Sequence, residues 1–221
     1  MVRGRGCFQI RQVRAIVKIS PAPLPAQDLY KLLTGIVVPR PIAWVTSRSD
    51  KGVVNLAPFS CFTFVSSKPP MVGINVGRRL GERKDTAVNI ERAKEFVVNI
   101  GDETMIEDIH RTGIAHPPHV SEVEVLGLEL AECDYVEVPR LAATPISLEC
   151  RLHQSLSFGE TGSQFIVGEV VLFHIRDGLS QNCKIDTAKL RPVCRIGGPN
   201  YASLGEIVSM QHVGDVRTGP G

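Results

Sequence analysis

Residues 36–100 constrain the fold most strongly, because short apolar segments there alternate with polar clusters. The segments 42–45, 59–65, 71–76 and 96–100 have the length and composition of buried strands. The polar residues between them gather at the strand ends instead of forming a solvated face. We therefore expect chemistry at the tips of these strands. The apolar runs 146–153 and 165–175, joined through a Gly-containing turn, extend the same pattern into the C-terminal third and predict a β-barrel hairpin.

Composition limits the broad class of the protein. A chain of 221 residues suffices for one domain with a sizeable core. With 43% hydrophobic and 22% charged residues, the chain is typical of an ordinary globule and not of a disordered or fibrous one. Aromatic residues make up only 5%, too few for a platform that stacks nucleic-acid bases. The fold class that we predict is mainly β with a few helices.

Charge is distributed unevenly along the chain. Five cations precede the first acidic residue, Asp28, which leaves 20 cations against 23 acids, a net charge of −3, for the rest. A mildly acidic body argues against an extended nucleic-acid surface. The cations interrupt the apolar residues near the N-terminus, so we expect neither a secretory signal nor a membrane span there. We predict a flexible basic extension over 1–27, a domain over 28–212 and a frayed tail over 213–221.

The six cysteines are scattered, with no C-x-x-C pair. We interpret them as reduced thiols of a cytoplasmic protein and not as a disulfide framework. Cys61 lies in the central stretch and is the candidate for a reactive thiol. A buried, inert cysteine is the more common case, and we expect it here.

Several local features predict secondary structure. Residues 28–33 are typical of a short helix that Thr34-Gly35 ends, and the turn at 48–52 is typical of a hairpin. Pro58 suggests a bulge or kink in its strand, of the kind that brings backbone amides toward a ligand. Asp85 or Thr86 is expected to cap a helix that runs to about residue 94. Residues 135–138 are a candidate short strand.

Three polar clusters carry the groups that bind phosphate. Thr46, Ser47 and Arg48 follow the first strand, and Lys84, Asp85 and Thr86 stand where a basic loop turns into a helix. Hydroxyls, cations and helix-terminal amides are the usual partners of a phosphate. No G-x-x-x-x-G-K-[ST] string and no G-x-G-x-x-G after a strand is present, so any nucleotide must be held in another way.

Other candidate residues have ordinary structural interpretations. His116 and His119 have a spacing that suits a metal, but no further ligand lies nearby in the sequence, so we interpret them as surface histidines. Glu149 and His174 lie inside apolar runs, where such groups are most often satisfied structurally; a paired His174 can also line a pocket.

The strings PRPIAWVTS, NLAPFS, KPPMV, KDTAVNI and EFVVN occur in this order from residue 39. Together they resemble the flavin reductase-like domain family, the flavoredoxin-like FMN-binding split barrels, over about residues 30–201. The resemblance implies a split β-barrel of Greek-key type and a homodimer with FMN near the interface. It also implies that the bound FMN accepts hydride from NADH or NADPH.

Carried over residue by residue, the resemblance implies a set of FMN-binding residues in four groups. Those groups are the strand-end cluster Thr46, Ser47 and Arg48, the ring-side residues Asn55, Ser60, Cys61 and Phe62, the strand-end Asn75, and the phosphate loop Lys84, Asp85 and Thr86. The arginines of the loop 77–83 align less well. No catalytic residue and no metal ligand is assigned, because hydride transfer to a flavin needs no protein acid or base.

The leading hypothesis is therefore a cytoplasmic NAD(P)H-dependent FMN reductase, which passes electrons to an acceptor or an oxygenase partner. The first alternative is an FMN-binding electron-transfer or flavin-storage protein with no nicotinamide-dependent turnover of its own. The second is a protein related by fold that oxidises a small substrate with bound flavin. We expect neither nucleic acid nor membrane among the partners.

Overall fold

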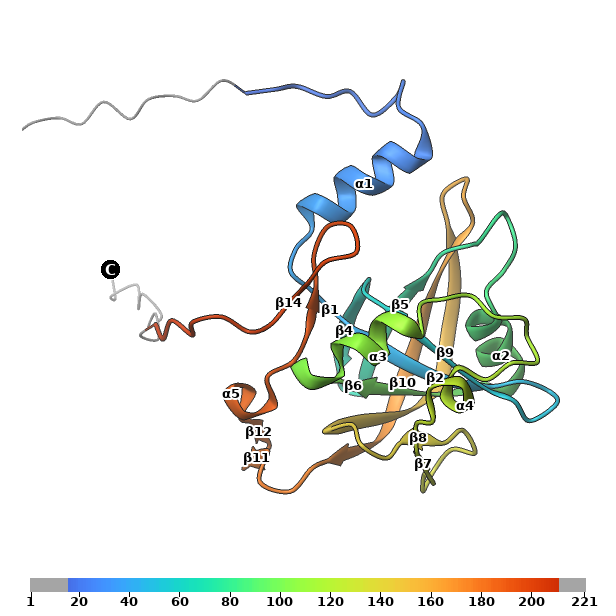
Figure 1. The fold of residues 1–221 in the computed structure, drawn as a ribbon, viewed down its shortest axis with the longest axis vertical. Coiled ribbons are helices and arrows are strands. Elements are labelled where there is room, and N and C mark those ends of the chain that lie inside the picture. The colour runs from blue at the N-terminus through green and yellow to red at the C-terminus, as the bar shows by residue number, and fades with distance from the viewer. Residues whose placement is uncertain (1–15, 211–221) are drawn as a thin grey trace, which may run out of the picture.

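The computed structural model describes residues 16–210, and half of the strands in this range, including the longest ones, form one antiparallel sheet (Figure 1). Its strand order is β3-β2-β6-β9-β10-β5-β4. The bounds are β2 Ala43–Arg48, β3 Val54–Phe59, β4 Phe62–Ser67, β5 Pro70–Val76, β6 Glu95–Ile100, β9 Ile146–Phe158 and β10 Ser163–Ile175.

The two edge strands of this sheet follow one another in the chain. Only Ser60 and Cys61 separate β3 from β4, so the sheet curls until its edges meet. The Asn75 amide donates to the Cys61 carbonyl at 2.8 Å and closes this corner. The mainly β barrel predicted from the sequence is therefore confirmed.

Smaller elements surround the barrel. They include three small antiparallel sheets. One has the order β1 Arg40–Pro41, β13 Cys194–Arg195 and β14 Tyr201–Ala202; the others pair β7 Leu130–Ala131 with β8 Arg140–Leu141, and β11 Ser180–Gln181 with β12 Lys184–Ile185. The helices are α1 Ala26–Ile36, α2 Asp85–Ala93, α3 Ile106–Arg111, α4 Glu122–Leu126, α5 Thr187–Leu190 and a 3₁₀ turn, Glu103–Met105. None of the helices within 16–210 is long and apolar enough to cross a membrane.

The two largest apolar clusters hold the barrel together. The main cluster fills the interior with side chains such as Ile74, Phe96 and Ile166, all fully buried. A second cluster lies around Trp44 and Leu56 and packs α3 and α4 onto the outside of β2 and β3. Burying side chains of this size stabilises the fold by roughly 1.5–3 kcal/mol each.

Helix α1 is longer than predicted and has no buried residue. It continues through Thr34-Gly35 because the Thr34 hydroxyl donates to the Tyr30 carbonyl at 2.8 Å and so stays within the helix. The helix ends at Ile36, shortly before Pro39, which cannot continue a helix. In Figure 1, α1 lies beside the loop before β14, and a Cβ on Gly197 in that loop would lie 3.5 Å from the Gly35 Cα.

Other local predictions need correction. The predicted strand 59–65 is broken by the turn at Ser60-Cys61, which starts β4 on the other edge of the sheet. Pro58 makes no bulge: it pairs with Trp44 in unbroken register, and its missing N–H is tolerated on an edge strand. Residues 135–138 form no strand, because amides of this segment donate to the Glu149 carboxylate instead.

The hairpin turn at 48–52 forms as predicted, with Gly52 at a φ of 83°. Helix α2 ends close to the expected position, but its N-cap is Lys84, so Asp85 and Thr86 are its first helical residues and cap nothing. The predicted tail 213–221 and residues 1–15 of the predicted N-terminal extension lie outside the described residues. The domain boundaries stay predictions.

Candidate functional site

Two adjoining cavities lie where β3 meets β4. One has a volume of about 460 Å³ and the other about 700 Å³, and both are lined by Pro58 and Lys84. We call the two together the Lys84 groove. Each cavity by itself has a volume that suits part or all of a small-molecule cofactor, since ligand sites usually occupy about 300–1,000 Å³. The smaller cavity is also lined by Asn55, Arg79, Arg83, Asp85, Thr86, His116 and Glu122, and the larger one by α1 residues, Arg40, Ser60, Cys61 and Asn75.

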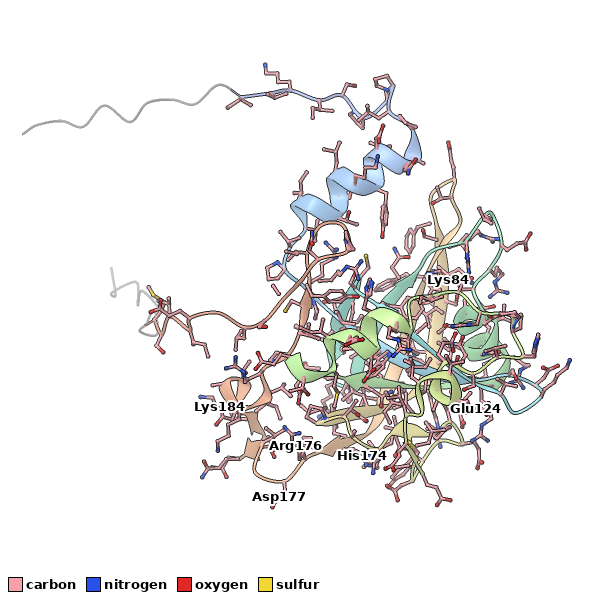
Figure 2. All side chains as sticks on the ribbon, in the orientation of Figure 1. Lys84, Glu124, His174, Arg176, Asp177 and Lys184 are labelled. Atoms are coloured by element: carbon pink, nitrogen blue, oxygen red, sulfur yellow. The ribbon has the colours of Figure 1, made fainter. Side chains whose placement is uncertain are left out.

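The smaller cavity concentrates positive charge at the start of α2. Lys84 is the N-cap residue, and the first amides of a helix have no partner within the helix. The Asn55 amide donates to the Thr86 hydroxyl at 3.0 Å, which holds β3 against the helix. Figure 2 places Lys84 on the side of the barrel near α2. This end of the groove therefore combines a cation, a hydroxyl and free amides.

Lys84 is a cation in a poorly solvated position. Burial lowers its pKa, and the nearby charge of Arg79 lowers the pKa further. Its ammonium lies 5.4 Å from the centre of the Phe59 ring, a weak cation–π contact. Neither Lys84 nor Arg79 has a carboxylate partner among residues 16–210. An anion in this cavity would compensate both charges.

Arg83 is already engaged. It pairs with Glu91 and donates through Nε to the Gln164 side chain at 3.0 Å. Glu91 also accepts from Ser155 at 2.8 Å. Arg83 therefore anchors the loop before α2 to β9 and β10, while Arg79 stays available to the cavity.

An acidic group also borders the smaller cavity. Burial raises the pKa of Glu122, although its carboxylate accepts a hydrogen bond from the Leu56 amide at 2.9 Å. The charge of His116 acts in the opposite sense and lowers this pKa. Asp85 is the first residue of α2, where a negative charge stabilises the helix dipole.

One residue that lines the larger cavity has an unusual polar atom. The Asn75 Oδ1 is buried and has no hydrogen-bond partner in the described structure. A buried carbonyl oxygen without a partner costs about 1–3 kcal/mol, so a ligand N–H at this position would be favourable. Ser60 lies on the same cavity and accepts from Arg40 Nε at 3.2 Å. Cys61 is exposed there, so the expectation that it is buried is wrong.

The other predicted residues do not line the groove. The Thr46 hydroxyl donates to the Pro139 carbonyl at 2.7 Å, whereas Ser47 points to the opposite face and accepts from Asn89 of α2 at 3.3 Å. Arg48 accepts from Arg92 through its carbonyl, and Phe62 packs against the barrel core. Ser47 still touches the site indirectly, because Asn55 lies within 3.4 Å of its hydroxyl.

Sequence reasoning missed part of the groove lining. Arg79 was only one of the less well aligned loop arginines and His116 was interpreted as a surface residue, although both border the groove. Arg40 also lines it, and nothing in the sequence assigned that residue to the site. Glu122 carried no signal at all, because an acid in a polar segment is usually solvated.

Comparison with known proteins places this architecture in a family. The model of the flavin reductase like domain matches residues 35–190. The chain belongs to this family. A relative from Halalkalibacterium halodurans, a protein of uncharacterised function, is 42% identical over 199 residues, covering 88% of this chain and 95% of the relative.

Two solved structures of named proteins share the fold. Nitrilotriacetate monooxygenase component B from Bacillus cereus has a TM-score of 0.86 and 38% identity, covering 89% of this chain and all of that chain. The 2-nitrobenzoate 2-nitroreductase from Pseudomonas fluorescens has a TM-score of 0.83 and 32% identity, covering 92% and 100%. The resemblance to flavin reductase-like split barrels is thereby confirmed.

Proposed function

We propose that this flavin reductase-like protein binds FMN in the Lys84 groove and transfers hydride to it from NADH or NADPH. When bound, FMN supplies the redox chemistry, because its ring accepts the hydride. The protein supplies orientation, electrostatics and exclusion of water. The observation that carries the proposal is the continuity of the groove, which joins a cationic end to an apolar end at Lys84 and Pro58.

The residues present fit the two ends of FMN. A phosphate suits the smaller cavity. Neither Lys84 nor Arg79 forms a salt bridge with an acid of residues 16–210, and the first amides of α2 have no acceptor within the helix. Thr86 adds a hydroxyl to this end, and Asn55 fixes its position. These residues, with Asp85 as a neighbour, form the phosphate end of the proposed site.

The flavin ring suits the larger cavity. Its polar edge carries an N–H group between two carbonyls, and the unpaired Asn75 Oδ1 can accept from such a group once the side chain turns toward the cavity. Ser60 and Cys61 lie at the turn between β3 and β4, where backbone amides can reach a ligand. Four of the residues expected from the sequence do not line the groove. In our proposal they support it indirectly and do not contact FMN: Thr46, Ser47, Arg48 and Phe62.

We also infer a homodimer with FMN near the interface. Helix α1 forms one wall of the larger cavity yet buries none of its residues. Tyr30, Leu33 and Ile36 are between 61% and 72% exposed, an apolar surface that a second copy can cover. In that arrangement α1 would become both an interface element and part of the flavin site.

The proposal is tested by two linked measurements. The purified protein is expected to bind FMN and then to oxidise NADH or NADPH when free flavin is added. Binding without turnover would favour the electron-transfer or storage alternative. Absence of binding would contradict the proposal.

The destination of the electrons is a further part of the proposal. Similarity to nitrilotriacetate monooxygenase component B supports an oxygenase partner, while similarity to 2-nitrobenzoate 2-nitroreductase supports direct reduction of a small nitroaromatic compound at the flavin. Anaerobic assays with a nitroaromatic acceptor separate the two. Only the second function predicts substrate-dependent NAD(P)H oxidation without oxygen or free flavin.

A further inference from the structure

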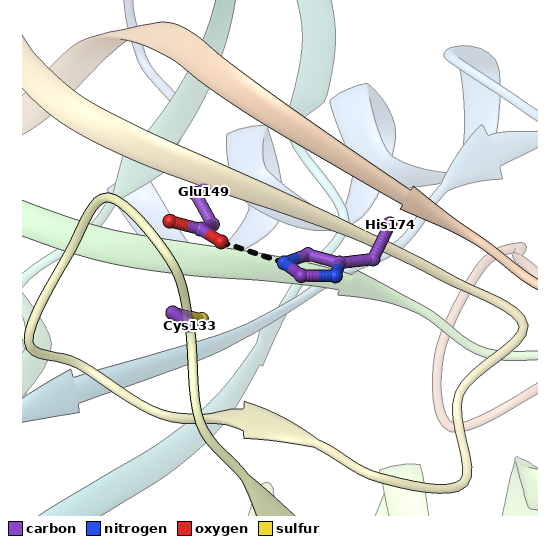
Figure 3. A group of neighbouring side chains, drawn as sticks. All are labelled: Cys133, Glu149 and His174. Carbon is purple, nitrogen blue, oxygen red and sulfur yellow. Dashed lines mark hydrogen bonds and ion pairs between the residues drawn. The ribbon is translucent and has the colours of Figure 1, made fainter.

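A second group of reactive side chains lies outside the Lys84 groove. The Cys133 Sγ, a Glu149 carboxylate oxygen and a His174 ring nitrogen all lie within 4.8 Å of one another (Figure 3). Glu149 is on β9 and His174 on the neighbouring β10, while Cys133 comes from the loop between β7 and β8. His174 and Lys84 are well separated in Figure 2.

The cluster is held in place by the loop that carries Cys133. Glu149 has no exposed surface, and its oxygens accept from the amides of Asp134 at 2.9 Å and Tyr135 at 2.7 Å. The same carboxylate lies 2.6 Å from His174 Nε2. The residues that follow Cys133 therefore orient the carboxylate, much as outer-shell donors orient a metal ligand.

We propose that Cys133, Glu149 and His174 form a binding site for a zinc ion. A thiolate, an imidazole and a carboxylate are the three ligand types that Zn²⁺ takes in proteins. Bonds of about 2.0–2.3 Å place tetrahedral ligand atoms roughly 3.3–3.8 Å apart. The 4.8 Å limit and the 2.6 Å contact in the cluster bracket this spacing, so side-chain adjustments of about 1 Å suffice.

The site would keep one coordination position for water. Glu149 is fully buried, but the His174 side chain is 21% exposed and Cys133 is partly exposed. An ion can therefore enter from the solvent side. Three protein ligands with one open position are typical of zinc sites that are not purely structural.

Binding must release a proton. A cysteine thiol has an ordinary pKa of about 8.5 and is mostly protonated at neutral pH. When Zn²⁺ binds, the S–H bond of Cys133 breaks, an S–Zn bond forms and the proton passes to solvent, while a ring nitrogen of His174 donates a lone pair.

The net charge around the cluster is compatible with a divalent cation. The thiolate and the carboxylate would carry two negative charges, and Arg140 is the cation that acts on Cys133. Arg140 opposes the zinc ion but does not cancel both ligand charges. The alternative is a cluster with a structural role alone, in which Glu149 serves only the loop amides and His174.

The test is a Co²⁺ titration of the full-length protein after treatment with a chelator. Tetrahedral Co²⁺ absorbs visible light at wavelengths beyond the flavin bands. We expect one Co²⁺ to bind, Zn²⁺ to displace it, and about one proton to be released per ion. The readout does not depend on FMN, so its failure is distinguishable from failure of the proposed function.

Matched variants decide the assignment. Cys133→Ser and His174→Ala should lose the Co²⁺ band and weaken Zn²⁺ binding by at least about 100-fold, the upper end of the loss for an outer-shell partner. Cys183→Ser and His153→Ala change exposed residues and should bind like the parent. Absence of the band in the parent, or its persistence in a folded Cys133→Ser variant, would overturn the proposal.

Discussion

Lys84 combines burial with the repulsion of a neighbouring arginine, and both effects disfavour its charged form. A position of this kind gains from an anion, because a bound phosphate restores the interaction that the buried ammonium lost with water. Asn75 is the corresponding residue at the other end of the groove, where a buried oxygen lacks a donor. Both residues destabilise the protein without a ligand, and both would contribute favourably to the free energy of ligand binding.

The first prediction concerns affinity. Lys84→Ala should weaken FMN binding by about 1–3 kcal/mol, since it removes a charged partner of the phosphate. Thr86→Ala should weaken binding by an amount in the same range. Thr86→Ser should bind FMN as tightly as the parent protein because it keeps the hydroxyl. Fluorescence titration of FMN measures these constants. Lys51→Ala, in the exposed hairpin turn, is the control.

Unchanged affinity in both Lys84→Ala and Thr86→Ala would remove the proposed phosphate end.

The second prediction concerns pH. Because the pKa of Lys84 is lowered from 10.5, its positive charge is lost at a lower pH than that of an ordinary lysine. FMN affinity should therefore fall as the pH rises from about 7 to about 10. In Lys84→Met this part of the pH dependence should vanish, as measured by FMN titration across the range. Parallel pH profiles for the two proteins would contradict the role of Lys84.

At the scale of elements, the strands were predictable. The face of the sheet to which each side chain at a strand end points was predicted less well. Apolar runs of the right length identified β5, β6, β9 and β10. Thr46 and Ser47 were grouped into one cluster, yet successive side chains of a strand point to opposite faces. One hydroxyl therefore meets the Pro139 carbonyl and the other meets α2. Period-two alternation would have separated them.

The break between β3 and β4 was not predictable from propensity. Residues 59–65 are continuously rich in strand-forming types, but closing the barrel requires a turn at Ser60-Cys61. Long-range geometry overrides local preference there. The same geometry brings Asn75 of β5 next to Cys61 and so completes the larger cavity, which no spacing in the sequence shows.

The third prediction tests how α1 is attached. Arg40 is almost fully buried and donates to the carbonyls of Thr34 and Val37, both at 2.6 Å, and to Ile196 at 3.2 Å. Arg40→Met should release α1 while the barrel stays folded. Hydrogen exchange of α1 amides should accelerate at least about tenfold, with little change in β9 and β10.

Arg176→Met is the matched control, because Arg176 is half-exposed and reaches Asp102 only at 3.9 Å. Unchanged exchange in α1 of the Arg40→Met protein would show that other contacts hold the helix.

At the scale of the whole molecule, apolar side chains remain exposed on α1, which borders the larger cavity, and on β4, which begins directly after the cavity-lining residues Ser60 and Cys61. The exposed residues include Tyr30 and Leu33 of α1 and Phe64 and Val65 of β4. The sequence predicted a homodimer only through its resemblance to a family, because an apolar position in a strand or helix is normally read as core. The structure supplies the reason to expect a partner surface there.

The fourth prediction follows from that surface. The protein should sediment as a dimer, and the double substitution Leu33→Asp with Ile36→Asp should give monomers with weaker FMN binding. Two buried carboxylates without partners would oppose association. Val125→Asp, on the exposed side of α4, should leave the dimer intact. Sedimentation velocity distinguishes these outcomes, and a parent protein that is monomeric at all concentrations would contradict the proposed interface.

The most direct test of the central claim is a titration of flavin-free protein with FMN, read by the flavin absorption spectrum. We expect the groove between β3, β5 and α2 to take up one FMN per chain at micromolar supply or below, giving a yellow protein. Lys84→Ala should bind measurably less tightly. A folded protein that stays colourless at that concentration, and whose Lys84→Ala variant behaves identically, would contradict the account.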